Sequence, residues 1–372
     1  MSNTIHELRE LGQSVWCDNI SRGMIDSGEL QRLIDLGVAG VTSNPTIFAK
    51  AITSGTDYDR LFDRLLGETP DDMGLYEGLV IPDIADAADI LRPVYDRTEG
   101  VDGYVSIEVN PKLAYDTEGT VQEARRLWGM LGRPNVLIKV PATEEGMPAV
   151  ETLIGEGINV NVTLIFSIGM YEKVMQAYMA GLEKLLASGG DVGKVSSVAS
   201  FFVSRVDTAV DKLLEVSRAQ GAEVGHLLGE SAVANAKLAY ARFGEVFASG
   251  GRWGELVSRG ARLQRPLWAS TSTKNSDYPD TLYVDNLVGP HTVNTLPPVT
   301  IEAVLDHGGA TATLAADVDS ARSLFGELAE LDINIEAVTD QLLIEGVKAF
   351  EGSFDDVLAD ITAKKSKPAT MS

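Results

Sequence analysis

Cysteine is almost absent from the sequence, since Cys17 is the only one among 372 residues. A single thiol cannot form an internal disulfide or a thiolate cluster around a metal ion. Histidine is scarce too, and the four histidines have no spacing typical of metal ligands; they are His6, His226, His291 and His307. The sequence therefore predicts neither a metal site nor a bound cofactor.

Long hydrophobic runs and positive charge are also lacking. No run of about 18 apolar residues occurs, which argues against a membrane-spanning helix, and residues 1–13 lack the apolar core of a signal peptide. The 31 Lys and Arg residues stand against 54 Asp and Glu residues, for a formal net charge of −23. Because nucleic acids and anionic membranes are bound by neutralising phosphates, neither is an expected partner. We expect a cytoplasmic protein that can bind a small phosphorylated ligand through a few local cations.

The sequence does contain a regular alternation of short apolar segments and helical patterns. Eight segments have the composition of strands, namely 14–20, 40–44, 103–110, 135–143, 158–166, 195–202, 265–274 and 291–296. Helical periodicity fills most of the intervals between them. Eight strands separated by helices predict an α/β fold of the (β/α)8 TIM-barrel type.

Two regions hold more helix than a barrel needs. The interval between strands six and seven has only helical periodicity around residues 207–262, which is longer than one crossover requires. Additional helices are predicted at the C-terminus, over 317–331 and 335–362. We therefore expect a single barrel domain over residues 1–363 with a helical insertion, followed by a disordered tail over 364–372.

The fourth predicted strand contains Lys139, in the apolar segment Asn135–Thr143. A strand of this composition between two prolines is typical of a parallel sheet that is buried on both faces. Burial disfavours the ammonium form of lysine and leaves a nucleophilic amine, which can form a Schiff base with a carbonyl. The alternative is a lysine at the strand end that reaches solvent or takes part in a structural ion pair.

Several predicted strands have one polar face. At a period of two residues, the fifth strand places Asn159, Asn161 and Thr163 opposite its apolar side chains. The other polar sets are Asp18 with Trp16, Thr42 with Asn44, Glu108 with Tyr104, Ser106 and Asn110, and Ser270, Ser272 and Lys274 with Trp268. Because the apolar faces must pack against the helices, we expect these sets to face the barrel lumen. They indicate a polar ligand site, although a water-filled lumen without chemistry would show the same pattern.

Residue type suggests a role for each of these side chains. Lys139 would attack a ketone, and Glu108 on the neighbouring strand would transfer protons, helped by a water held by Thr163. Asp18 would accept the hydroxyl proton whose loss drives carbon–carbon cleavage, while Asn44 and Asn161 would hold substrate hydroxyls. Arg205, at the predicted start of a helix, and Lys274 would bind a phosphate. The N-terminus of that helix would bind the phosphate together with the Arg205 guanidinium.

These residues together resemble the transaldolase family, in a longer bacterial subtype, from about residue 15 to residue 362. The resemblance depends on four motifs, which are T-S-N-P-T (42–46), L-I-K-V-P-A-T (137–143), I-N-V-N-V-T-L-I-F-S (158–167) and S-T-K-N (272–275). It implies a class I, Schiff-base-forming transferase of the non-oxidative pentose phosphate pathway. Such an enzyme moves a dihydroxyacetone unit from a ketose phosphate, sedoheptulose 7-phosphate or fructose 6-phosphate, to an aldose phosphate, glyceraldehyde 3-phosphate or erythrose 4-phosphate.

The resemblance also implies site residues. The catalytic group would be Lys139, Asp18, Glu108 and Thr163, and the substrate-binding group would be Asn44, Asn161, Ser200, Phe202, Arg205, Ser272 and Lys274. Many relatives carry an arginine at the position of Lys274, and a lysine keeps the charge without the bidentate geometry. Cys17 is expected to be a packing residue rather than a nucleophile.

Two other functions remain open at this point. The first is a class I aldolase, a lyase that releases free dihydroxyacetone instead of transferring it. The second is a non-catalytic barrel that binds sugar phosphates. The sequence does not distinguish a monomer from a homodimer.

Overall fold

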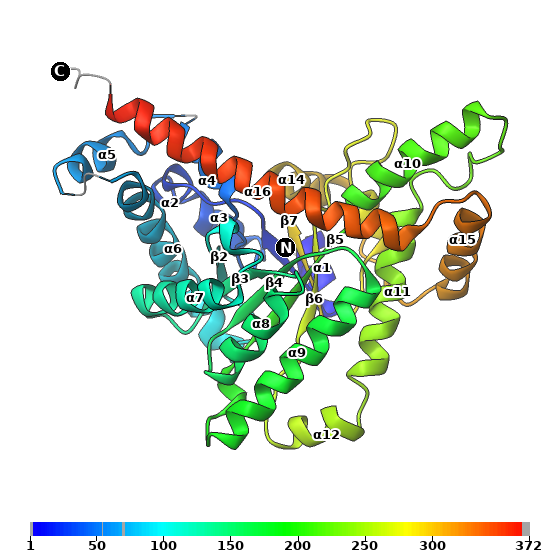
Figure 1. Cartoon of the computed structure of the whole chain (residues 1–372), viewed down its shortest axis with the longest axis horizontal. Helices are drawn as coiled ribbons and strands as arrows, with labels where there is room; N and C mark the ends of the chain where they lie inside the picture. Colours follow the sequence, from blue (N-terminus) through cyan, green and yellow to red (C-terminus); the bar gives the residue numbers. More distant parts are fainter. Residues whose placement is uncertain (1–2, 54, 69–70, 367–372) are drawn as a thin grey trace.

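The computed structural model describes residues 3–53, 55–68 and 71–366, and its centre is one parallel sheet surrounded by helices (Figure 1). The sheet has seven strands in the order β1-β7-β6-β5-β4-β3-β2. Their bounds are β1 (Gln13–Cys17), β2 (Val105–Glu108), β3 (Val136–Pro141), β4 (Val160–Ile165), β5 (Ser197–Phe202), β6 (Arg265–Ala269) and β7 (Thr292–Leu296). All pairs are parallel, as expected for strands that alternate with helices along the chain.

The predicted second strand, residues 40–44, closes this sheet but is not a regular strand. Val41 forms single parallel bridges to Cys17 of β1 and to Val105 of β2. Gly40 lies against the indole of Trp16, where a Cβ atom would be 2.6 Å from the ring, and Pro45 begins the next helix. The segment is therefore too short and too crowded to pair further. Because Val41 bridges β1 and β2, the segment occupies the eighth strand position and closes the barrel. The predicted TIM-barrel fold is confirmed.

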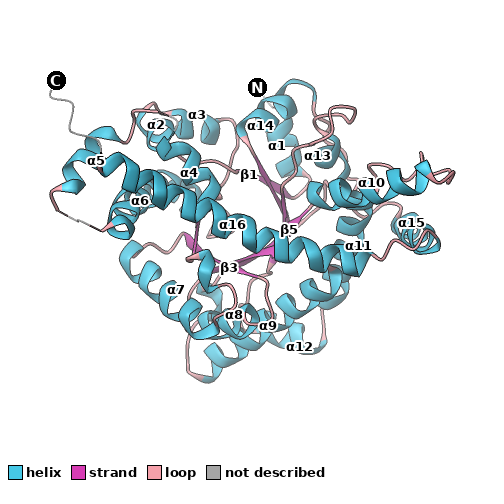
Figure 2. Ribbon diagram, turned by 45° about the horizontal axis from the view of Figure 1, so that its top comes forward, coloured by secondary structure: helices cyan, strands magenta, loops and turns pink. Residues whose placement is uncertain are grey.

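The helices cover the outside of the sheet (Figure 2). They are α1 (Thr4–Glu10), α2 (Arg22–Asp26), α3 (Glu29–Asp35), α4 (Pro45–Thr53), α5 (Asp59–Leu66), α6 (Asp72–Arg97), α7 (Thr117–Leu131), α8 (Gly146–Gly155), α9 (Ile168–Ala187), α10 (Ser204–Ala219), α11 (Ser231–Val246), α12 (Gly251–Ser258), α13 (Leu282–Asn286), α14 (Pro298–His307), α15 (Val318–Glu330) and α16 (Ile335–Lys365). Within the described ranges, every one of them is too short or too polar to span a bilayer.

The predicted helical insertion consists of α10, α11 and α12, which follow one another between β5 and β6. The C-terminal helix α16 runs across one end of the barrel and packs on α4, α6 and β4 (Figure 1). It continues through Lys365, so residues 364 and 365 of the predicted tail are helical. Lys364 and Lys365 form ion pairs with Asp59 and Asp72, which fixes the last helical turn. Residues 367–372 of that predicted tail lie outside the described residues.

Two differences from the predicted elements have local causes. Helix α4 was not predicted, and it begins at Pro45, a residue favoured in the first turn because it lacks an N–H. The predicted strand 265–274 ends at Ala269, because Ser270 adopts a left-handed conformation with φ of 56°. Ser272 and Lys274 therefore belong to a loop rather than to a strand.

The polar faces predicted for β1, β2 and β4 do meet inside the barrel, but the one predicted for β6 is wrong. Trp268 packs edge-on against Phe201 at 6.0 Å, and Phe201 packs against Tyr171 of α9, so this indole faces the helices. The lumen side of β6 holds Arg265, which reaches Asp102 at 2.8 Å, and Ala269. The early end of the strand at Ala269 explains the error, because the serines beyond it do not continue its alternation.

Candidate active site

The strand register brings predicted catalytic and substrate-binding residues of three strands together. Lys139 of β3 pairs with Glu108 of β2 on one side and with Asn161 of β4 on the other. Side chains at paired positions of a parallel sheet point to the same face. Lys139, Glu108 and Asn161 therefore form one row across the lumen.

Lys139 is buried, with only 6% of its side chain exposed. Its Nζ donates a hydrogen bond to the Ser43 carbonyl oxygen at 2.9 Å and lies 3.2 Å from Oε2 of Glu108, whose side chain is 2% exposed. The ring of Phe350 on α16 lies 5.8 Å from Nζ. The lysine is thus held inside the barrel by a carbonyl, a carboxylate and an aromatic ring, and not at the solvent-facing end of its strand.

Three buried oxygens in this region have no hydrogen-bond partner among the described residues. They are Oγ1 of Thr163 and both carboxylate oxygens of Glu108, of which Oε2 forms the ion pair with Lys139. Burial raises the pKa of Glu108, and the nearby Asp18 carboxylate adds to the effect, while the Lys139 ammonium opposes it. A carboxyl group with a raised pKa is better suited than an ordinary glutamate to both give and take a proton.

Asp18 follows β1 and lies at the opening of the barrel. Its Oδ1 accepts a hydrogen bond of 2.7 Å from the Thr42 hydroxyl, which also contacts Thr295 at 2.6 Å. Burial raises the pKa of Asp18, and the Thr42 hydrogen bond and the charges of Lys139 and Lys274 oppose this rise. Asp18 therefore has the environment of a base that can return its proton.

Two serines fix the side chain of Asn161 within this row. Its amide nitrogen donates to Oγ of Ser106 at 3.0 Å, and its Oδ1 accepts from Oγ of Ser200 at 2.7 Å. These contacts settle the orientation of the amide and join β2, β4 and β5. Asn161 thus supports the floor of the site.

Two cations lie at the outer side of the site. Arg205 is the second residue of α10, stacks on the Phe202 ring at 5.4 Å, and forms no ion pair within 4 Å in the described part of the chain. Lys274 donates to Oγ of Ser272 at 2.6 Å. Burial lowers the pKa of Lys274 and the charge of Arg205 lowers it further, whereas Asp18 raises it. A half-buried arginine and an exposed lysine that repel each other are a suitable site for an anion.

Most of these residues line one pocket with a volume of about 180 Å³. We call it the mouth pocket; it is lined by Asp18, Thr42, Asn44, Lys139, Thr163, Ser200, Phe202, Arg205, Ala269, Ser270, Ser272, Lys274, Thr295, Pro297 and Phe350. Of the predicted site residues, Asn161 lies below it, and Glu108 contacts Lys139 from an adjoining cavity. All the predicted residues thus lie in one region, although their roles stay predictions.

Comparison with known proteins gives the same picture of the whole chain. The model of the family described as transaldolase/fructose-6-phosphate aldolase matches residues 15–361. The chain belongs to this family. It is 50% identical to the transaldolase of Thiobacillus denitrificans over 96% of this chain and 99% of the relative. It is 46% identical to transaldolase 2 of Nostoc sp. over 97% of each chain, and 47% identical to the transaldolase of Mycobacterium tuberculosis over 96% of this chain and 95% of the relative.

Membership of the transaldolase family confirms the resemblance drawn from the four motifs, and with it the expected class of enzyme, a transferase. Cys17 is completely buried in this transaldolase-family barrel, and burial raises the pKa of its thiol to about 12. A thiol in that state is unreactive, which agrees with the predicted packing role.

Sequence reasoning missed Phe350 and the Ser43 carbonyl. Phe350 lies in the middle of a long amphipathic helix, where an aromatic residue is usually part of the core, so no local pattern marks it. Ser43 stands inside the T-S-N-P-T motif, but a carbonyl contact does not depend on the side chain. Both contacts arise from how distant segments meet.

Proposed function

We propose that this chain transfers a dihydroxyacetone unit between phosphorylated sugars through a Schiff base on Lys139. The donor would be sedoheptulose 7-phosphate or fructose 6-phosphate, and the acceptor glyceraldehyde 3-phosphate or erythrose 4-phosphate. The observation that carries the proposal is the buried Lys139 amine 3.2 Å from a buried carboxylate. Because a nucleophilic amine needs a proton acceptor within hydrogen-bond reach, this pair supports covalent catalysis.

The first half of the reaction forms the Schiff base. Glu108 takes the proton of the lysine, and the uncharged amine attacks C2 of the ketose to give a carbinolamine. Glu108 then returns a proton to the C2 hydroxyl, which leaves as water while the nitrogen lone pair forms the iminium bond. The raised pKa of Glu108 suits a group that acts alternately as base and acid.

The second half moves the carbon unit. Asp18 removes the proton of the C4 hydroxyl, the C3–C4 bond breaks, and its electron pair is taken up by the iminium to give an enamine. The aldose product leaves, and the enamine attacks the aldehyde carbon of the acceptor while Asp18 returns its proton to the new alkoxide. Addition of water to the iminium, with Glu108 as base, then releases the product.

Arg205, Lys274 and Ser272 would bind the phosphate at the far end of the sugar. Their place on the outer side of the mouth pocket supports this, because the reacting carbons must reach Lys139 deeper in the barrel. Asn44, Asn161, Ser200 and Phe202 would form the walls around the chain of hydroxyls. In a protein with a net charge of −23, a pair of cations with no carboxylate within 4 Å among the described residues is unusual enough to indicate an anion site.

Reductive trapping tests this proposal directly. Borohydride added with fructose 6-phosphate should reduce the iminium, and peptide mapping should find the added mass on Lys139. A mass on another residue, or none, would refute the covalent mechanism. Transfer is separated from simple aldol cleavage by comparing free dihydroxyacetone with the acceptor product. A large excess of free dihydroxyacetone in the presence of acceptor would favour the aldolase alternative that the family description includes.

Cytoplasmic location and a monomeric or homodimeric state remain predictions of the same proposal. No group of three or more His, Cys, Asp or Glu side chains in the described ranges could hold a metal ion. The proposed chemistry uses only the side chains named above.

A further inference from the structure

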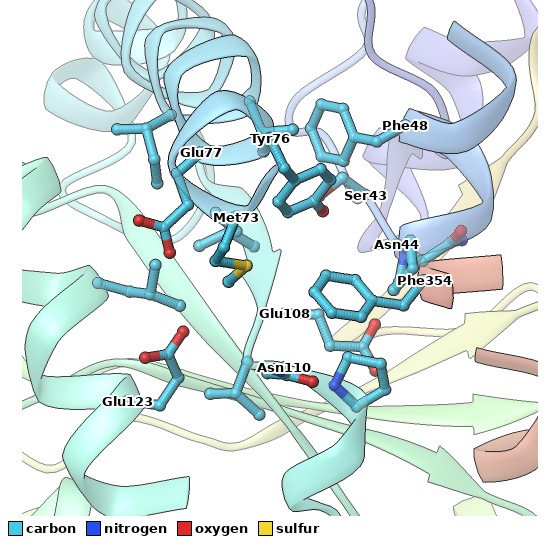
Figure 3. A pocket seen from close by; sticks show the side chains of 17 residues that line it. Ser43, Asn44, Phe48, Met73, Tyr76, Glu77, Glu108, Asn110, Glu123 and Phe354 are labelled. Carbon is cyan, nitrogen blue, oxygen red and sulfur yellow. The ribbon is translucent and has the colours of Figure 1, made fainter. Parts of the chain in front are cut away.

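A second, smaller cavity lies behind Glu108, between α6, α7 and the C-terminal part of α16 (Figure 3). We call it the rear cavity; its lining includes Tyr76, Glu77, Val80, Glu108, Glu123 and Phe354. Its volume is about 30 Å³. Since a cavity needs roughly 10–15 Å³ to hold one water molecule, this one has room for one or two.

Glu108 opens into the rear cavity and not into the mouth pocket. It lines the former only, whereas Asn44 lines both and marks the boundary between them. The Glu108 side chain is 2% exposed, and its Oε1 has no hydrogen-bond partner among the described residues. A buried carboxylate oxygen normally has a partner, and the polar groups of Asn44 and Tyr76 on the same lining offer a water the further contacts it needs.

The outer end of the rear cavity carries charge and reaches solvent. Glu77 and Glu123 lie on its far side from Glu108, with Met73 between them and Glu108 (Figure 3). Arg126 bridges the two, with Nη1 3.0 Å from Glu77 Oε2 and Nε 2.8 Å from Glu123 Oε2. The two glutamate side chains are 18% and 15% exposed, so water can reach this end from outside.

The proposed reaction needs a path by which water can leave and enter the site while the sugar is bound. Each turnover releases one water when the carbinolamine dehydrates and consumes one when the final iminium is hydrolysed. During both steps the sugar occupies the mouth pocket, where Lys139 is reached by substrate. Glu108, which must exchange protons with that water, lies at the entrance of the rear cavity.

From this geometry we infer that the rear cavity is a water site through which Glu108 exchanges water and protons with solvent while the sugar fills the mouth pocket. In the forward step the C2–O bond breaks, the oxygen leaves as water with a proton from Glu108, and that water passes into the rear cavity. In the reverse step a water from the cavity adds to C2 and gives its proton to Glu108. The inference rests on the proposed Schiff-base function.

Oxygen exchange measures this path. The purified enzyme is incubated with fructose 6-phosphate in 18O-labelled water without acceptor, and label entering C2 is followed after subtraction of the spontaneous exchange. Val80→Leu adds bulk to the cavity lining and should lower the catalysed exchange at least about tenfold. The amount of borohydride-trapped Lys139 at equilibrium should stay unchanged, because filling the cavity slows both directions equally.

Matched variants decide the result. Val94→Leu makes the same change at a buried position of the same helix that does not line the cavity, and it should exchange oxygen at the wild-type rate. Val80→Ala enlarges the cavity and should not slow exchange. If Val80→Leu does not fold, Val80→Ile takes its place, because it adds the same number of atoms and keeps the branch at Cβ. Wild-type exchange in folded Val80→Leu or Val80→Ile, or equal slowing in Val94→Leu, would overturn the inference. Failure to trap Lys139 in the wild type would instead overturn the proposed function.

Discussion

At the scale of single residues, the ion pair between Lys139 and Glu108 determines how a substitution of Lys139 affects stability and activity. The carboxylate is buried beside the amine, so removing the positive charge would leave it unpaired, and an unpaired buried charge is strongly destabilising. A variant that keeps the charge but cannot add to a carbonyl separates catalysis from folding. Arginine has these two properties.

Lys139→Arg should therefore abolish turnover while the protein stays folded. We expect kcat to fall at least on the order of 10³-fold, with no borohydride adduct, and the free energy of unfolding to change by about 1–3 kcal/mol because of the larger side chain. Steady-state kinetics and denaturant unfolding measure the two effects. Lys173→Arg, at an exposed pair with Glu144, is the control and should keep normal activity. Normal activity in Lys139→Arg would refute the assigned role.

Replacing Asp18 by asparagine should change stability and activity in opposite directions. Its raised pKa means that the folded protein resists ionising this carboxyl, whereas the unfolded chain ionises it above about pH 3.9. The stability of the wild type is therefore reduced as the pH rises from about 4 through the raised pKa. Asp18→Asn avoids this loss, so it should be more stable than the wild type at neutral pH, and the difference should disappear below about pH 4.

The same variant should lose about 10²–10⁴-fold in kcat, because an amide cannot accept the hydroxyl proton. Thermal unfolding at several pH values, together with kinetics, checks both parts. The Thr42 hydroxyl can still donate to the Oδ1 of an asparagine, so local structure should persist. A variant that is less stable than the wild type at every pH would contradict the proposed burial of the charge.

At the scale of elements, α16 determines the shape of the mouth pocket. Gly346 of this helix faces β4, and a Cβ atom there would lie 3.0 Å from Cδ2 of Leu164 and 3.6 Å from Nη1 of Arg205. Leu164 itself has a left-handed backbone, with φ of 61°, at the irregular end of β4. Close packing of helix and strand at this point places both Arg205 and Phe350.

Gly346→Val should push α16 away from the barrel. We expect a loss of about 1–3 kcal/mol in the free energy of unfolding and a raised KM for phosphorylated donors, because Arg205 and Phe350 move. Gly352→Val is the matched control, since it lies on the same helix and a Cβ atom there has no neighbour within 4 Å. The difference between the two variants isolates packing from helix propensity. Equal KM values in both would show that α16 does not shape the site.

How far the sequence predicts these elements depends on which contacts are local. The alternation in β2, β3 and β4 predicted that Glu108, Lys139 and Asn161 would lie side by side, because regular paired strands keep their register. The same reasoning failed on β6, where the left-handed Ser270 ends the strand. The position of α16 across the barrel, and hence the role of Phe350, depends on packing between distant segments, which no local pattern encodes.

At the scale of the whole molecule, the two ends of the barrel have different tasks. The mouth contains the site, while the opposite end is closed by a buried polar cluster around Asp102. This carboxylate accepts hydrogen bonds from Ser14 Oγ at 2.8 Å, Trp16 Nε1 at 3.0 Å and Arg265 Nη2 at 2.8 Å. It therefore connects β1 and β6 to the segment that precedes β2. In barrels of this kind the end opposite the site serves stability rather than catalysis.

Asp102→Ala should consequently lower stability without changing the chemistry. Removing the carboxylate leaves the Arg265 guanidinium buried without its ion-pair partner, which typically costs about 3–5 kcal/mol. Asp96→Ala is the control: it removes an exposed pair with Arg92, of 2.7 Å, which is worth about 1 kcal/mol or less. Denaturant unfolding should separate the two variants clearly, while kcat measured at low temperature, where both are folded, should equal that of the wild type. If Asp102→Ala unfolded like Asp96→Ala, closure of the barrel would not depend on this cluster; if it lost kcat while folded, the two ends would not be independent.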